Sequence, residues 1–170
     1  KIRNKILETR KTYYRNKKSA IIRKGLQVHL VDGFYIPINH DWKKIAINLS
    51  GGADSACLAF ILCKIIMENN WHVQIDVITH SRVWQKRPWA SVVSVNVYNK
   101  LREMFPDIIS ARFTNYIPPE LEYASVGHIV NNRSGDQIAV DSFNNYVANV
   151  NGYNAIYNAT TKNPSTKKPI

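Results

Sequence analysis

Cysteine, acidic residues and long apolar runs are all scarce in this sequence. Only Cys57 and Cys63 occur among its 170 residues, and both fall in one predicted helix. Six positions of a helix correspond to about 600° of rotation, so the two thiols point in different directions. This argues against a disulfide and against a structural zinc site, and two buried free thiols fit a cytoplasmic setting. No apolar run reaches the ~18 residues of a membrane span, so we expect no membrane partner.

Acidic residues number 12 against 23 Lys and Arg, which gives a net charge of +11. The excess is concentrated in residues 1–24, which carry ten bases and one acid, whereas residues 25–170 carry 13 bases and 11 acids. We expect residues 2–23 to form a basic helical arm. One interpretation is that the arm contacts nucleic-acid phosphates, and the other is a solvated basic helix; charge alone does not separate them.

Apolar periodicity predicts strands alternating with helices from residue 44 onward. The expected helices cover residues 54–70, 91–105 and 135–150, and the expected strands cover residues 44–49, 73–79, 108–116 and 153–159. A short strand at residues 26–30 precedes them, followed by a second short strand or an extended stretch at residues 34–38. Alternating strands and helices are typical of a parallel sheet. The sequence therefore predicts an α/β fold with a three-layer α/β/α arrangement and a mainly parallel sheet.

A glycine-rich segment stands between the first apolar strand of this series and the helix that follows it. Its sequence is Leu49-Ser50-Gly51-Gly52-Ala53-Asp54-Ser55. A strand that runs into a helix gathers free backbone N–H groups at the positive end of the helix dipole. Adjacent glycines let the backbone approach a ligand closely, and the two serines add hydroxyl donors. The segment therefore predicts a phosphate site, in which Asp54 caps the helix or helps to hold a divalent cation.

The same segment resembles the SGGxDS motif of the N-type ATP pyrophosphatases, the PP-loop family, which includes GMP synthetase, NAD synthetase and tRNA lysidine synthetase. The resemblance covers residues 44–163. It implies an adenine nucleotide alpha hydrolase-like (HUP) fold that binds ATP and Mg²⁺ at the carboxyl edge of the sheet. It also implies that the protein adenylates an acceptor and releases pyrophosphate, as a ligase-type enzyme.

The resemblance extends to further residues at that edge. It implies nucleotide contacts from residues 49–55 and from the end of the second strand, at Thr79, His80, Ser81 and Arg82. Lys86 and Arg87 follow as candidates for phosphates or an acidic acceptor, with a solvated basic loop as the alternative. The resemblance also implies that Thr160 faces the nucleotide. The implied catalytic residues are Asp54, Ser55 and Lys162, with Lys162 at the α-phosphate and Asp54 at the metal.

Several alternatives stay open on the sequence. The acceptor is a nucleobase, a tRNA or a small carboxylate or amide, and residues 125–136 are either its binding loop or an ordinary connection. A sulfonucleotide enzyme related to phosphoadenosine-phosphosulfate reductase, or a non-catalytic nucleotide- or nucleic-acid-binding module, would carry a similar loop. The expected organisation is a basic arm (1–24), an ATP-binding domain (25–164) and a tail (165–170). A homodimer, and a fragment that lacks C-terminal elements, both fit this organisation.

Overall fold

The computed structural model describes residues 27–31, 34–83, 88–124 and 135–159. The chain divides into two compact units, Lys1–Trp42 and Lys43–Ile170. The predicted arm and the predicted boundaries at residues 24 and 164 lie outside the described ranges. In the first unit, β1 (Gln27–Val31) and β2 (Phe34–Ile38) pair antiparallel, with Val31 opposite Phe34. The strand expected at residues 26–30 is therefore present, and residues 34–38 form a strand rather than an unpaired extended stretch.

The second unit is built on a four-stranded sheet whose strands all run parallel. The strands are β3 (Lys44–Asn48), β4 (Gln74–Ser81), β5 (Ile109–Tyr116) and β6 (Ile156–Asn158), and their order across the sheet is β5-β4-β3-β6. This confirms the predicted α/β class and the parallel sheet. β4 extends two residues beyond the predicted end at residue 79, and β6 is shorter than the predicted 153–159.

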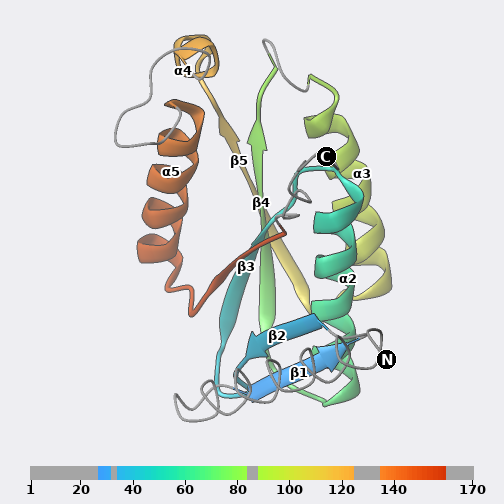
Figure 1. The fold of residues 1–170 in the computed structure, drawn as a ribbon. Coiled ribbons are helices and arrows are strands. Elements are labelled where there is room, and N and C mark those ends of the chain that lie inside the picture. Colours follow the sequence, from blue (N-terminus) through green and yellow to red (C-terminus); the bar gives the residue numbers. More distant parts are fainter. Residues whose placement is uncertain (1–26, 32–33, 84–87, 125–134, 160–170) are drawn as a thin grey trace, which may run out of the picture. The chain divides into compact units, whose positions relative to one another are not determined.

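Helices lie on both sides of this sheet. Figure 1 shows α2 (Ala53–Glu68) and α3 (Ala90–Met104) on one side, and α5 (Gly135–Asn151) on the other. A short helix that the sequence did not predict, α4 (Pro119–Ala124), precedes α5. Within the described ranges, no helix combines the length and apolar character needed to cross a bilayer.

The core of the second unit forms where the helices meet the apolar strands. Ile45, Ala46 and Ile47 of β3 are fully buried on both faces of the sheet, as the unbroken apolar run of this strand predicts. Helix α2 was expected to be largely buried, but only one side of it is: Leu62, Cys63 and Ile66 are inaccessible, whereas Cys57, Phe60 and Met67 are exposed.

The expectation of two buried thiols is therefore wrong for Cys57 and confirmed for Cys63. A helix that packs on one face of a sheet buries only the stripe that faces the strands, so apolar residues on its outer side remain accessible. Burial raises the pKa of the Cys63 thiol to about 12, which keeps it protonated and unreactive.

The strand order places a topological switch at β3. From β3 the chain passes through α2 to β4 on one side, whereas β5 leads through α5, on the opposite face, to β6 on the other side of β3. The chain that leaves the carboxyl end of β3 enters α2, whereas the chain that leaves the carboxyl end of β5 leads to α5 on the opposite face, so the two connections diverge. In open α/β sheets, ligands bind in the crevice that such a divergence leaves. The glycine-rich segment follows β3 directly and so lies at this crevice.

Candidate functional site

The segment from Ser50 to Ser55 forms a tight bend that leads from β3 into α2. Gly51 has a φ of 79°, in the left-handed region that favours glycine. Gly52 is the N-cap of α2 in an extended conformation, and no side chain caps the helix through it. The first turn of a helix has N–H groups without intrahelical acceptors. The bend therefore presents the positive end of α2 without a capping side chain on Gly52.

Gly51 also lies against the first turn of α3. A Cβ atom at this position would stand 2.9 Å from the carbonyl oxygen of Ala90 and 3.2 Å from the backbone nitrogen of Ser94. Both neighbours are backbone atoms, which cannot move aside as a flexible side chain would. Glycine is thus required here both by its φ angle and by the close approach of a second helix.

Two serine hydroxyls hold the bend in shape. Ser55, which is buried, donates its hydroxyl proton to the carbonyl oxygen of Gly52 at 3.0 Å and accepts from the Ser50 amide at 3.2 Å. The Ser50 and Ser55 hydroxyl oxygens are 3.1 Å apart, and the Gly52 amide donates to Ser50 Oγ at 3.3 Å. Because the Ser55 hydroxyl proton goes to the Gly52 carbonyl oxygen, the Ser50 hydroxyl is the donor in its hydrogen bond to Ser55 Oγ. Two amides of the predicted phosphate site thus donate to the protein's own hydroxyls.

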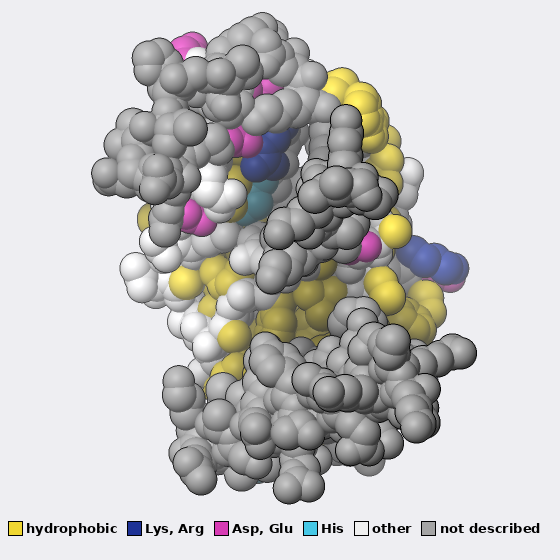
Figure 2. Space-filling view, viewed as in Figure 1, with side chains coloured by type: hydrophobic (Ala, Val, Ile, Leu, Met, Phe, Trp, Pro, Cys, Tyr) yellow, Lys and Arg dark blue, Asp and Glu magenta, His cyan; other side chains and the backbone are white. Residues whose placement is uncertain are grey.

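A cleft of about 370 Å³ opens beside this bend. Its walls come from the carboxyl ends of three strands and from the first half of α5, and the residues that line it include Leu49, Ser50, Ser55, His80, Arg82 and Gln137. Figure 2 shows a histidine and basic side chains together in a hollow of this face, with acidic side chains beside them. The volume lies within the range of small-molecule sites, and the cleft coincides with the topological switch.

Hydrogen-bonding side chains from all four strands meet on the α5 side of the sheet at this end. Asn48 of β3 donates to Asn158 of β6, and His80 of β4 lies beside Asn115 of β5. His80 Nε2 is 3.1 Å from Asn48 Oδ1 and 3.2 Å from Asn144 Oδ1, the latter on α5. We call these five side chains the amide row: Asn48, His80, Asn115, Asn144 and Asn158.

The proton of His80 can be assigned from its neighbours. The Asn115 amide nitrogen faces Nδ1 at 3.1 Å and can only donate, so Nδ1 accepts and Nε2 carries the proton. Desolvation by burial lowers the pKa of His80 to about 4, with a further lowering from the positive charge of Arg82. The hydrogen bond to Asn144 and the charge of Asp141 oppose this shift. His80 is therefore neutral at physiological pH, and so is the whole amide row.

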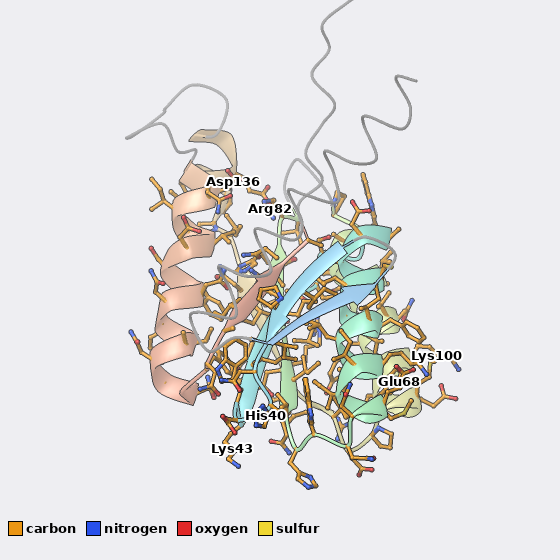
Figure 3. All side chains as sticks on the ribbon, turned by 60° about the horizontal axis from the view of Figure 1, so that its bottom comes forward. His40, Lys43, Glu68, Arg82, Lys100 and Asp136 are labelled. Atoms are coloured by element: carbon orange, nitrogen blue, oxygen red, sulfur yellow. The ribbon has the colours of Figure 1, made fainter. Side chains whose placement is uncertain are left out.

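Arg82 follows β4, lines the cleft and forms an ion pair with Asp136 of α5. Its Nε atom is 3.0 Å from Oδ2 of Asp136, a nearly buried carboxylate in the first turn of α5. Figure 3 shows the two labelled residues side by side, one at the end of β4 and the other on α5. Because the pair uses Nε, the terminal nitrogens of this cleft-lining guanidinium can still donate to a ligand.

The other residues predicted at the end of β4 lie on the opposite face of the sheet. Thr79 is buried and donates to the Ser94 hydroxyl of α3 at 3.2 Å, and Ser81 is buried as well. Side chains alternate between the two faces of a strand, so His80 and Arg82 reach the cleft while Thr79 and Ser81 do not. Of the four consecutive residues singled out in the sequence, two line the cleft.

Asp54, the predicted metal ligand, is exposed in the first turn of α2. Among the described residues, no three His, Cys, Asp or Glu side chains cluster as a metal site would. Thr160, Lys162, Lys86, Arg87 and residues 125–134 lie outside the part of the chain that the structure describes. Ala53 is exposed at the first position of the helix.

The sequence interpretation missed the asparagines of the amide row. Three of the four strands carry an Asn at or near their carboxyl ends, and carboxyl ends of parallel strands share one edge of a sheet. That shared position was the signal that could have found them. Searches with the sequence against models of known protein families and against curated proteins find no match.

Proposed function

We propose that this protein binds ATP with Mg²⁺ at the carboxyl edge of the β5-β4-β3-β6 sheet, adenylates an acceptor and releases pyrophosphate. In this proposal the second unit is a HUP-type domain and the segment from Ser50 to Ser55 is its pyrophosphate loop. The observation that carries the proposal is the position of this loop: it lines the 370 Å³ cleft at the topological switch, directly before the N-terminus of α2.

The local geometry supports polyphosphate binding in two ways. The bend at Gly51 and the absence of a side chain on Gly52 leave the start of α2 open to the approach of an anion, which a helix N-terminus favours. The amides of Ser50 and Gly52 now donate to serine hydroxyls over 3.2 and 3.3 Å. A charged phosphate oxygen is a stronger acceptor than a hydroxyl, so phosphate can replace these contacts.

The described residues fit a magnesium ion that is held mainly by the substrate. Mg²⁺ at nucleotide sites is commonly held by one or two carboxylates together with phosphates and water. Asp54 is an exposed carboxylate at the start of α2, next to the proposed phosphate position. When bound, the ion would offset negative charge on the polyphosphate. Asp54 is the residue that we propose to hold it.

The proposed reaction is a displacement at the α-phosphorus of ATP. An oxygen of the acceptor forms a bond to the α-phosphorus, the bond from that phosphorus to the bridging oxygen breaks, and pyrophosphate leaves with the bonding electrons. Ser55 and the loop amides hold the departing pyrophosphate. Lys162 is proposed to stabilise the charge that develops at the α-phosphate, with Thr160 beside the nucleotide and Arg82 on the cleft wall.

Calorimetric titration with ATP–Mg²⁺ tests the proposal. Ser55→Ala and Asp54→Ala are expected to weaken ATP binding at least tenfold while circular dichroism shows a folded protein. Ser142→Ala removes a hydroxyl at an exposed position of α5 and serves as the matched control. A wild-type protein that binds neither ATP–Mg²⁺ nor magnesium pyrophosphate would contradict the proposal.

The same titration separates the alternatives raised by the sequence. Tighter binding of a sulfonucleotide than of ATP would favour a phosphoadenosine-phosphosulfate reductase-like enzyme. Binding of ATP without pyrophosphate release, across nucleobase, tRNA, carboxylate and amide acceptors, would favour a non-catalytic module. Release of pyrophosphate and AMP with one of these acceptors identifies it.

A further inference from the structure

The amide row has more acceptors than donors at its centre. His80 is neutral, and its only N–H group, on Nε2, faces both Asn48 Oδ1 at 3.1 Å and Asn144 Oδ1 at 3.2 Å. A neutral imidazole supplies one proton, so the two oxygens must share it. A donor brought by a ligand would therefore complete the hydrogen bonding of the row.

The missing hydrogen-bond donor could come from the cleft side of the row. Asn48, His80 and Asn158 line the cleft, whereas Asn144 does not. Asn48 Nδ2 donates to Asn158 Oδ1, which leaves Asn48 Oδ1 to accept from a ligand and the amide nitrogen of exposed Asn158 to donate to one. An acceptor and a donor from two residues of one cleft wall complement a planar group that carries one N–H and one carbonyl or ring-nitrogen acceptor.

The cleft has one set of groups that suits an anion and another set, the amide row, that carries no charge. The start of α2, the serine hydroxyls and Arg82 suit an anion, whereas the row contributes only amides and a neutral imidazole. A carboxylate has no N–H group to give to Asn48 Oδ1, and its oxygens would face that oxygen directly. A buried polar group that a ligand leaves unpaired opposes binding.

From these contacts we infer that the amide row binds the donor–acceptor edge of an uncharged planar group, a nucleobase or a carboxamide, and discriminates against a carboxylate. This inference rests on the proposed function for the neighbouring phosphate site, and it narrows the ligand of the same cleft. Such an edge could belong to the adenine of ATP or to the acceptor that is adenylated.

Nicotinamide and nicotinate are matched probes, because they share a ring and differ in carboxamide against carboxylate. We expect ligand-observed NMR with the full chain to show nicotinamide binding at least tenfold more tightly than nicotinate, in the presence and absence of magnesium pyrophosphate. Equal affinity, or a preference for nicotinate, would overturn the inference without any variant having to fold.

Asn48→Leu removes the acceptor from the cleft wall without adding charge. It should weaken nicotinamide binding at least tenfold and leave magnesium pyrophosphate binding unchanged, whereas Asn99→Leu, at an exposed position of α3, should change neither. Unchanged nicotinamide binding by a folded Asn48→Leu protein would also overturn the inference. If nicotinamide binds but neither ATP nor pyrophosphate does, the proposed function fails and the inference about the row stands.

The Asn48→Leu variant also distinguishes whether ATP or the acceptor supplies the planar group. If adenine occupies the row, Asn48→Leu weakens ATP but not pyrophosphate, and ATP displaces nicotinamide. If the acceptor occupies it, ATP affinity is unchanged and nicotinamide binds together with ATP. Both results support recognition by the row and differ only in which substrate brings the edge.

Discussion

Gly51 is required both by its positive φ and by the close approach of α3, whereas Gly152 is required by its φ alone. Gly51 and Gly152 have φ angles of 79° and 66°, but a Cβ at Gly152 would have open space, whereas one at Gly51 would meet the Ala90 carbonyl at 2.9 Å. Gly152→Ala should therefore lower the free energy of unfolding by about 1 kcal/mol, the usual cost of the left-handed conformation. Gly51→Ala adds backbone displacement and should cost about 2–4 kcal/mol. Urea denaturation of both variants measures the difference, and equal losses would contradict the close approach.

The neutrality of His80 predicts a pH-dependent loss of stability. Its pKa is about 4 in the folded protein against 6.5 for a free imidazole, so the unfolded chain binds the proton first as pH falls. Stability from this residue is complete above pH 6.5 and is lost as pH falls toward 4, by an amount on the order of 2–3 kcal/mol.

The free energy of unfolding of wild type and of His80→Gln is measured at pH 7 and pH 4.5, and the wild type should lose more stability between the two. His72→Gln, at an exposed loop position, is the matched control and should lose as much as the wild type. An NMR titration of the His80 ring gives the pKa directly. A His80 pKa near 6.5 would contradict the buried, neutral imidazole.

At the residue scale, the sequence was sufficient to predict features that depend only on neighbouring residues in the chain. Adjacent glycines after an apolar strand predict a tight bend, and the structure has one, with Gly51 in the left-handed region. It was insufficient for the amide row, because an asparagine at the end of a strand is also an ordinary turn residue. The pairing of Asn48 with Asn158, 110 positions apart, and the contacts of His80 show that these side chains form one row.

At the scale of elements, a buried carboxylate on one strand forms an ion pair and hydrogen bonds with neighbouring elements. Asp76 of β4 is fully buried, accepts from Lys44 of β3 at 2.8 Å and from the Ala111 amide of β5 at 2.9 Å, and receives the Tyr153 hydroxyl at 2.7 Å. Burial and the neighbouring Asp76 carboxylate raise the pKa of Tyr153. These contacts join three strands to the segment between α5 and β6.

Tyr153→Phe removes one hydrogen bond to a buried charge and should lower the free energy of unfolding by about 2 kcal/mol. Tyr116→Phe, at a tyrosine that is 70% exposed, should change it by less than about 0.5 kcal/mol. Thermal and urea denaturation of the two variants measure both effects. Equal stability of the two would show that the Asp76 cluster does not hold this edge of the sheet.

Element types were predictable and their ends were less so. Apolar runs predicted every strand and long helix among the described residues, because the period of burial differs between the two. The end of β4 moved from residue 79 to Ser81 because its last residues pair with β5, with Ser81 opposite Tyr116. β6 pairs with β3 over only three positions. Such ends depend on neighbouring strands rather than on local sequence, and six-residue α4 is too short for a periodic signal.

At the scale of the whole molecule, charge separates the arm from the rest of the chain. Deleting residues 1–24 removes nine of the eleven net positive charges. If the protein binds RNA through the arm, the deletion should abolish that binding and its salt dependence, in which log affinity falls with log salt by about 0.7 per single-strand phosphate contact.

ATP binding should be unchanged by the deletion, because the cleft is lined by residues between 48 and 159, and the two further residues proposed at the nucleotide, Thr160 and Lys162, also lie outside the deleted arm. Filter binding at several salt concentrations and ATP titration measure the two effects. Loss of ATP binding, in a truncated protein that remains folded, would contradict a site contained within the second unit.

The close approach of Gly51 to α3 means that the loop and the start of that helix must move together. Trp89 is the N-cap of α3, 62% exposed, and immediately precedes the residue whose carbonyl Gly51 abuts. Any shift of the bend on phosphate binding would thus alter the surroundings of an indole already present in the native chain. If the loop binds phosphate as proposed, the fluorescence of Trp89 should change when the loop is occupied.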